Sequence, residues 1–221
     1  KIGHSGTLDP DAVGVLPVYL GKATRLIEYA GEDFKEYYAE LTFGYATDTA
    51  DDSGTIIKTS SIKLPSKVTM ETVLGKFKGE QSQIPPMYSA VRYQGKKLYE
   101  LARAGIEVER KSRKIMIHEL ELLHCGNDYL LLRITCSKGT YIRTLCEDIA
   151  EAFFMCGTVS FLYRTRSGQF TNLTAHSLAE IQKSPAQCII SADAAITDLT
   201  EIILTNNQAL RLSQGVATSV N

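Results

Sequence analysis

Residues 3–10 read Gly3-His4-Ser5-Gly6-Thr7-Leu8-Asp9-Pro10, and no other stretch of the chain says as much about the fold. Gly3 and Gly6 lack a Cβ atom, so the backbone there can turn tightly and approach a ligand closely. Pro10 disfavours helical geometry at the residue before it, which predicts an extended or turn conformation at Asp9. The stretch therefore predicts a loop in which one carboxylate is held close to a ligand.

This loop and the two segments after it, Gly14-Val15-Leu16-Pro17 and Gly21-Lys22-Ala23-Thr24, resemble the TruB family of pseudouridine synthases. In that family the Asp of the G-H-x-G-x-L-D-P loop is the essential catalytic residue, so the resemblance implies a catalytic role for Asp9. It also implies that His4 enters the T loop of tRNA and stacks in the gap that the flipped base leaves. Lys22 is expected to contact the substrate as part of the same match.

A second match is Cys136-Ser137-Lys138-Gly139-Thr140-Tyr141-Ile142-Arg143-Thr144-Leu145, where a strand is expected to pass through a glycine turn into a helix. An Arg in the first turn of a helix suits the helix dipole poorly, so a buried carboxylate is the natural group to offset the charge of Arg143. In the TruB family the Arg of this segment pairs with the catalytic Asp, which implies an Arg143–Asp9 pair. From the residues alone, a surface position for Arg143 is an equal alternative. Tyr141 is expected to bind the substrate.

A third match consists of Lys35-Glu36-Tyr37, Gly44 and Thr47-Asp48-Thr49-Ala50-Asp51-Asp52-Ser53-Gly54. It resembles the K-x-Y strand and the following turn of the same family. The resemblance implies that Tyr37, rather than Tyr38, stacks on the target base and that Asp51 contacts the substrate. Without the resemblance, Tyr37 is better interpreted as a core residue, because aromatic side chains on an apolar strand face usually pack inward.

A fourth match covers residues 83–90 and 95–103, which in the family belong to a segment that folds over the RNA. Basic side chains alternate here with tyrosines, a combination that suits phosphate contact and base stacking. The competing interpretation is a tyrosine cluster beneath a solvated basic face. The residues expected to contact RNA are Lys96, Lys97, Arg103 and Lys138.

The composition is that of an ordinary globular protein, with 44% hydrophobic and 22% charged residues among 221. The net charge of −1 argues weakly against an RNA partner, although lysines and arginines cluster over residues 96–114. No apolar run approaches the roughly 18 residues that span a bilayer, and no signal peptide is visible. Five scattered cysteines without C-x-x-C spacing predict reduced thiols and a cytoplasmic location.

Hydrophobic periodicity predicts strands and helices that intermix without a regular βαβ pattern, which favours an α+β fold with a mainly antiparallel sheet. Gly54 and Gly126 lie in the expected turns. The expected elements are a helix over 22–31 that ends at Gly31, strands over 35–45, 55–62 and 158–165, a helix over 69–78 with Thr69 as a possible N-cap, a short helix over 98–104, a hairpin of 114–124 and 129–136, and a helix over 140–154.

The resemblance implies the pseudouridine synthase fold, a curved mixed sheet with flanking helices and a central active-site cleft. It implies a catalytic domain over residues 1–195 whose N-terminal part is missing, and a truncated RNA-binding domain that starts at 196–221. The implied reaction converts uridine 55 in the T loop of tRNA to pseudouridine, with base flipping and without a metal or cofactor, by a monomer. Two alternatives stay open: a guide-RNA-dependent enzyme acting on ribosomal RNA, and a tRNA chaperone that needs no catalysis.

Overall fold

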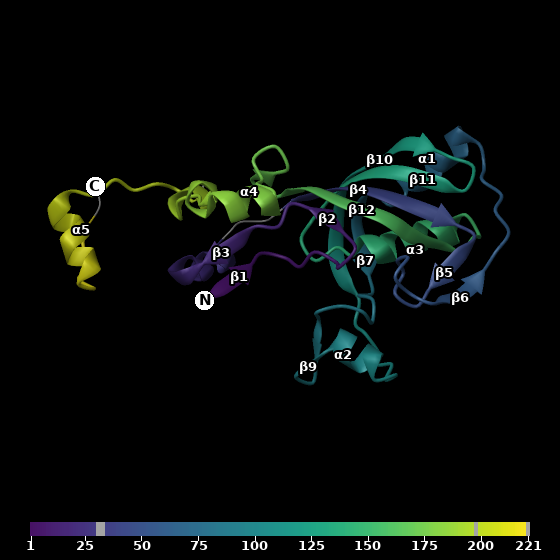
Figure 1. The fold of residues 1–221 in the computed structure, drawn as a ribbon, viewed down its shortest axis with the longest axis horizontal. Coiled ribbons are helices and arrows are strands. Elements are labelled where there is room, and N and C mark those ends of the chain that lie inside the picture. The colour runs from purple at the N-terminus through teal and green to yellow at the C-terminus, as the bar shows by residue number, and fades with distance from the viewer. Residues whose placement is uncertain (30–33, 197–198, 220–221) are drawn as a thin grey trace.

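The structure is a computed structural model that describes residues 1–29, 34–196 and 199–219. A mainly antiparallel sheet lies at its centre, with strand order β13-β12-β4-β11-β10-β7 and with β2 joined to β12 in parallel (Figure 1). This arrangement confirms the predicted α+β class and mixed sheet. The strands are β2 (Val13–Gly14), β4 (Lys35–Phe43), β7 (Gly79–Gln83), β10 (Arg113–Cys125), β11 (Tyr129–Cys136), β12 (Gly157–Ser167) and β13 (Phe170–Thr171).

The alternation predicted for residues 35–45 sets the two faces of the sheet. Tyr37, Ala39, Leu41 and Phe43 are buried on one face of β4, whereas the residues between them are half-buried. The neighbouring strand β11 alternates in the same way and contributes further buried side chains such as Leu132. Because β4 lies between β11 and β12, its apolar face forms the middle of the core.

Helices α1 (Lys67–Gly75) and α3 (Ile142–Ala152) cover this apolar face, α3 against β12 and β4, and α1 against β10. Helix α1 begins earlier than predicted, and its N-cap is Ser66 rather than Thr69. The Ser66 hydroxyl accepts the hydrogen bond from the Thr69 backbone N–H, so Thr69 is the third residue of the helix. Helix α3 is shorter at both ends than the predicted span of 140–154.

The N-terminal residues form a two-stranded unit beside the sheet. Strands β1 (Ile2–His4) and β3 (Val18–Leu20) pair with each other and lead into the 3₁₀ helix η1 (Gly21–Glu28). This short helix replaces the predicted helix over 22–31, and the predicted end at Gly31 lies outside the described residues. The loop between β1 and β2 carries Asp9.

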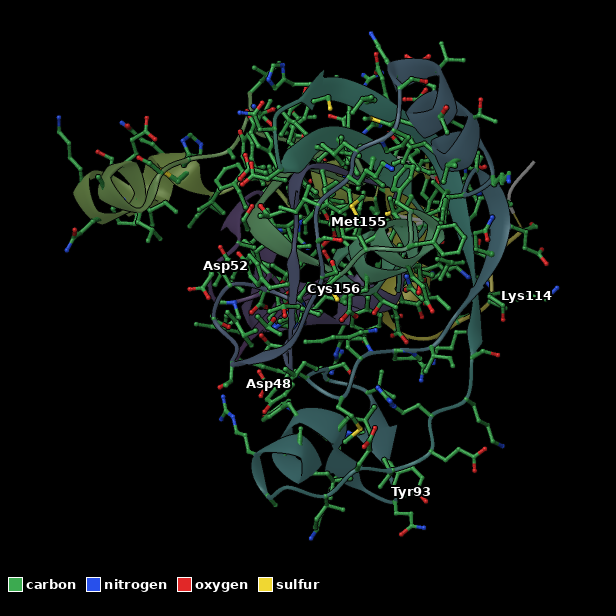
Figure 2. The ribbon with its side chains drawn as sticks, turned by 90° about the vertical axis from the view of Figure 1, so that its right-hand side faces the viewer. Asp48, Asp52, Tyr93, Lys114, Met155 and Cys156 are labelled. Atoms are coloured by element: carbon green, nitrogen blue, oxygen red, sulfur yellow. The ribbon has the colours of Figure 1, made fainter. Side chains whose placement is uncertain are left out.

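Two smaller pieces extend from the sheet. Strands β5 (Tyr45–Thr47) and β6 (Ile56–Thr59) form a hairpin around the predicted turn at residues 51–54. Strands β8 (Arg92–Tyr93) and β9 (Lys96–Lys97) and helix α2 (Leu98–Arg103) form a separate lobe below the sheet in Figure 1. Figure 2 also shows Tyr93 on this lobe, far from Met155 and Cys156 in the interior.

The described residues after β13 form four short helices: α4 (Leu178–Lys183), η2 (Pro185–Cys188), η3 (Asp193–Ala195) and α5 (Asn206–Ser213). Neither α4 nor α5 has a buried residue, and α5 stands far from the sheet in Figure 1. The division after residue 195 stays a prediction. No helix in the described part of the chain combines the length and the apolarity that a membrane span requires.

Candidate active site

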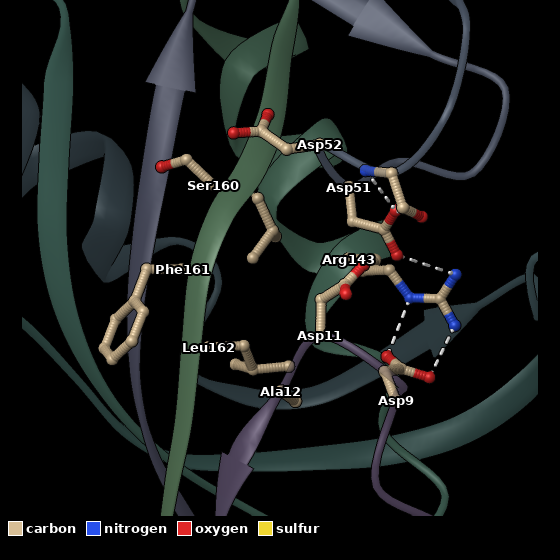
Figure 3. Close-up of a pocket in the computed structure, with 11 residues that line it drawn as sticks. Asp9, Asp11, Ala12, Asp51, Asp52, Arg143, Ser160, Phe161 and Leu162 are labelled. Atoms are coloured by element: carbon tan, nitrogen blue, oxygen red, sulfur yellow. Dashed lines mark hydrogen bonds and ion pairs between the residues drawn. The ribbon is translucent and has the colours of Figure 1, made fainter.

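The side chains of Asp9 and Arg143 form a bidentate ion pair. Arg143 Nε donates to Asp9 Oδ2 and Nη2 donates to Asp9 Oδ1, both at 2.9 Å (Figure 3). Asp9 comes from the loop after β1, and Arg143 is the second residue of α3, so the pair joins two distant parts of the chain. Two parallel hydrogen bonds between charged groups fix both the position and the orientation of the carboxylate.

The remaining donors of Arg143 also have partners. Nη1 donates to the Thr49 carbonyl at 2.8 Å and lies 3.6 Å from Asp51 Oδ2, and Nη2 donates to the Tyr88 carbonyl at 3.0 Å. Arg143 is only 5% exposed. A buried guanidinium needs such a complete set of acceptors, because each unpaired N–H would carry a desolvation penalty. The equal alternative of a surface arginine is therefore wrong.

The start of α3 is held by a glutamine that the sequence did not single out. The Gln83 side chain accepts from the Tyr141 backbone N–H at 2.8 Å and donates to the Tyr141 carbonyl at 3.0 Å. Gln83 is buried and ends β7, a polar edge strand that hydrophobic periodicity did not predict. These two bonds connect the edge of the sheet to the helix turn that carries Arg143.

A cavity of about 400 Å³ opens beside the ion pair. Asp9 lines this cavity, and its side chain is 33% exposed in spite of its two bonds to Arg143. Figure 3 shows Phe161 lying away from Arg143, across β12. The lining comes from four segments: Asp9, Asp11 and Ala12; Asp51, Asp52 and Ser53; Arg143; and Val159, Ser160, Phe161 and Leu162.

Asp51 is held in place at the wall of this cavity. Its Oδ1 atom accepts hydrogen bonds from the Thr49 hydroxyl at 2.7 Å and from the Ser53 backbone N–H at 3.2 Å. The Ser53 hydroxyl donates to the same oxygen. The Asx-type turn therefore leaves Asp51 Oδ2 directed at Arg143, which accounts for the spacing of the Thr-Asp-Thr-Ala-Asp segment.

Tyr37 lies in the core near this site, and it does not line the cavity. It is 7% exposed, and burial raises the pKa of its hydroxyl to about 12, against the opposing effect of the nearby positive charge of Arg164. The nearby Asp9 carboxylate raises this pKa further. The core interpretation describes the observed position, and stacking of Tyr37 on a base stays a prediction.

The other predicted contact residues lie outside the cavity. His4 and Lys22 are exposed on β1 and η1, whereas Lys96, Lys97 and Arg103 belong to the lobe of β8, β9 and α2. The Lys97 Nζ and Arg103 Cζ atoms lie over the Tyr99 ring, 5.3 and 5.4 Å from its centroid. Tyr141 is half-buried before α3, and the exposed Lys138 lines a second cavity of about 370 Å³. Their roles stay predictions.

Helix α3 also carries acidic and thiol groups near the site. Burial, together with the neighbouring Asp148, raises the pKa of Glu147 to about 7, while Arg143 and Arg110 oppose the shift. Burial likewise raises the pKa of the Cys146 thiol on α3, and it raises the pKa of the Cys136 thiol at the end of β11 to about 12. All five cysteines are free, as the scattered spacing predicted. Among the described residues, no group of three or more His, Cys, Asp or Glu side chains is arranged to hold a metal ion.

Two family profiles match consecutive parts of the chain: the TruB family pseudouridylate synthase N-terminal domain over residues 1–142, and the tRNA pseudouridylate synthase B C-terminal domain over 143–211. The tRNA pseudouridine synthase B of Caldanaerobacter subterraneus subsp. tengcongensis is 47% identical over 188 residues, which cover 85% of this chain. That of Symbiobacterium thermophilum is 42% identical over 223 residues, which cover 100% of this chain and 74% of that protein. The chain spans 66% of the Caldanaerobacter protein.

Solved structures with a similar fold include a Cbf5-Nop10-Gar1 complex, with a TM-score of 0.63 and 29% identity over 89% of this chain and 50% of the other. An archaeal box H/ACA sRNP Nop10-Cbf5 complex matches with a TM-score of 0.67 and 24% identity over 98% of this chain and 58% of the other, a likeness of fold. The family profiles together cover residues 1–211, and they meet inside α3, next to Arg143. This chain belongs to the TruB family of pseudouridylate synthases.

Proposed function

We propose that this chain converts uridine to pseudouridine in tRNA, at position 55 of the T loop. The observation that carries the proposal is the Asp9 carboxylate, which Arg143 holds with two bonds at the wall of a cavity, within the loop that matches the family. The reaction breaks the bond between the sugar C1′ and the uracil nitrogen, turns the base and rejoins it through carbon.

A uridine within a folded loop must leave its stack before Asp9 can reach it, which costs a few kcal/mol. Stacking of a base on an aromatic ring returns about 1–3 kcal/mol. We assign the stacking on the extruded uracil to Tyr37 and the filling of the vacated gap to His4. Tyr37 is buried in the free chain, so this role requires its ring face to become accessible when RNA binds.

The chemistry needs one carboxylate near the sugar, and the two donors of Arg143 fix the position and orientation of the Asp9 carboxylate. Three routes fit this geometry equally: attack of the carboxylate on the sugar C1′, addition to the uracil ring, and removal of a proton from the sugar C2′. Asp51, Tyr141 and Lys22 are proposed to contact the substrate.

Outside the cavity, we assign RNA contacts to Lys96, Lys97, Arg103 and Lys138. Four basic side chains on exposed or half-exposed positions suit phosphate contacts, which depend on charge and access rather than on a cavity. We place the chain in the cytoplasm, where reductants keep thiols free as its five cysteines are. We further propose that it acts as a monomer, which sedimentation with and without tRNA tests.

The deciding experiment incubates the chain with an unmodified tRNA transcript and maps pseudouridine by chemical labelling. The expected result is modification at the T-loop uridine and nowhere else. A parallel reaction supplies a ribosomal RNA fragment with a guide RNA, and modification there alone would favour the guide-dependent alternative. Refolding of tRNA without any pseudouridine, retained in Asp9→Asn, would favour a chaperone.

A further inference from the structure

Arg164 is the largest side chain that is almost fully enclosed, with 1% exposure, and it lies on β12 behind the Asp9 loop. Its guanidinium donates to three backbone carbonyls: Nε to Val15 at 2.7 Å, Nη1 to Thr7 at 3.2 Å and Nη2 to Gly6 at 3.3 Å. Gly6 and Thr7 precede Asp9 and Val15 follows it, so one side chain binds the loop on both sides of the carboxylate.

The backbone of Arg164 binds the same loop. The Val15 N–H donates to the Arg164 carbonyl at 2.8 Å, and Gly14 lies beside Arg164 in the parallel pairing of β2 with β12. Gly14 has a φ of +116°, and a Cβ atom there would lie 2.1 Å from the Arg164 carbonyl oxygen. Only glycine permits this close approach, so the backbone at Gly14 packs directly against the backbone of Arg164.

The charge of Arg164 is balanced differently from that of Arg143. In residues 1–29, 34–196 and 199–219, no carboxylate forms an ion pair with Arg164, and carbonyl dipoles accept its bonds instead. Burying a charged side chain without a paired carboxylate costs more free energy than burying a methionine of similar size. A packing role alone therefore does not account for an arginine at this position.

Arg164 also lies beside the second group that the proposed reaction uses, because it is the register partner of Tyr37 in the antiparallel pairing of β12 with β4. Lys35, two residues before Tyr37 on β4, donates from Nζ to the Ser5 carbonyl at 3.4 Å. Two buried cations, Arg164 and Lys35, thus connect the loop that carries Asp9 to the strand that carries Tyr37.

We propose that Arg164 is a positioning residue, which holds the Asp9 loop in a fixed arrangement against the strand that carries Tyr37. It touches neither the reacting atoms nor the Asp9 carboxylate, which Arg143 binds from the other side. The inference rests on the proposed function for its catalytic consequence. Its structural part, the immobilised loop, is measurable without any substrate.

The test compares Arg164→Lys and Arg164→Met with Arg166→Met. Arg166 lies two residues further along the same strand, is exposed, and donates from its side chain to the nearby Gly168 carbonyl. Amide hydrogen exchange is followed over residues 5–15 in the free protein. Single-turnover rates and the Kd for an unmodified tRNA transcript are then measured for each variant.

We expect both Arg164 variants to exchange faster over residues 5–15, with β4, β10 and β11 unchanged. A displacement of about 1 Å at the reacting groups costs about 100-fold in rate, so the single-turnover rate should fall about 10- to 100-fold while the Kd stays within a factor of about two. Arg166→Met should match the wild type. If Arg164→Met loses its fold, Arg164→Lys keeps the charge and most of the packing and serves in its place.

Unchanged exchange over residues 5–15 in a folded Arg164 variant overturns the proposed immobilisation. Faster exchange with an unchanged single-turnover rate overturns the positioning role. A wild-type chain that makes no pseudouridine refutes the proposed function instead, and the exchange measurement then still decides whether Arg164 holds the loop.

Discussion

The Asp9 carboxylate and the Arg143 guanidinium are 134 positions apart in the chain and are joined by two hydrogen bonds of 2.9 Å. Arg143 is almost fully enclosed, whereas a third of the Asp9 side chain is exposed and Asp9 lines the cavity. The pair is thus asymmetric: the cation is structural and surrounded by protein, and the anion faces the space where a substrate would bind. The ion pair therefore stabilises the negative charge of Asp9 and leaves the carboxylate accessible to a bound substrate.

Asp9→Asn should abolish pseudouridine formation and leave tRNA binding intact. Asparagine keeps the size of the side chain but lacks its charge and basicity. This loss is expected to lower turnover by about 100- to 10,000-fold. The matched control is Asp11→Asn, because Asp11 lines the same cavity, whereas Arg143 forms its ion pairs with Asp9 and Asp51. Chemical mapping of pseudouridine and a filter-binding Kd measure the two effects, and substantial turnover by Asp9→Asn would remove Asp9 from the mechanism.

Arg143→Lys should reduce both activity and stability while the chain still folds. An ammonium group cannot reproduce the planar fork that serves Asp9 together with the Thr49 and Tyr88 carbonyls. Each lost charge-assisted hydrogen bond contributes about 1.5–3 kcal/mol, so the free energy of unfolding should fall by about that amount or more. Urea denaturation and single-turnover rates test this, and wild-type activity in the variant would mean that the ion pair is dispensable.

Tyr37→Phe should keep part of the activity, and Tyr37→Leu should lose much more. Phenylalanine retains the flat ring that a base can stack on, whereas leucine fills a similar volume without it, and the difference amounts to about 1–3 kcal/mol. Because Tyr37 is buried in the core, the two variants are compared at equal folded fraction, established by thermal melting. Equal turnover under that condition would contradict the stacking role and leave Tyr38 as the next candidate.

The stability of the chain should depend on pH through Glu147. Its pKa of about 7 in the folded chain lies above its ordinary value of 4.5, so the folded state binds this proton more tightly than the unfolded state. As the pH rises from 4.5 through 7, this contribution to the free energy of unfolding is lost. Glu147→Gln should therefore be more stable than the wild type at alkaline pH, and the difference should vanish at acid pH.

Urea midpoints on either side of this pH range measure the Glu147 effect. Glu28→Gln is a suitable control, because Glu28 is exposed at the end of η1 and far from α3 in the sequence. A difference between Glu147→Gln and wild type that does not change with pH would contradict the assignment.

The lobe that carries Lys97 and Arg103 should contribute to RNA affinity through phosphates. Replacing both with glutamine is expected to weaken tRNA binding and to reduce the slope of log K against log salt by about 0.7–0.9 for each lost contact. Lys67→Gln, an exposed lysine on α1 paired with Glu71, is the control. An unchanged salt slope in the double variant would assign the basic side chains to a solvated face.

Local patterns in the sequence predicted the centre of the fold well. The alternation at Tyr37, Ala39, Leu41 and Phe43 identified the buried face of β4, and the Gly126 turn identified the hairpin of β10 and β11. The periodicity and the turn residues that determine these elements lie close together in the chain, so one sequence is enough to recognise them. The polar edge strand β7 was missed, because an edge strand needs no buried face and its residues have no apolar period.

The contacts between residues of the site were harder to predict from the sequence. The Arg143–Asp9 pair followed from a family resemblance, since nothing in the local pattern around either residue specifies a partner so far along the chain. Gln83 begins the fourth match and Arg164 lies in a predicted strand, but the sequence assigned neither of them a role. Both act by binding backbone carbonyls or amides of distant segments, and such partners carry no side-chain signal.

Strand β4 has a further consequence for how the chain acquires its structure. Its two neighbours fall on opposite sides of the boundary at residues 142 and 143, since β11 precedes α3 and β12 follows it. Closure of the sheet by β12 brings the Asp9 loop against Arg164 and the start of α3 against Asp9, contacts of long sequence separation that are costly to form early. A chain cut at that boundary would divide both the sheet and the ion pair between two fragments. We therefore expect the Asp9–Arg143 pair to form late in folding, once β12 has joined the sheet.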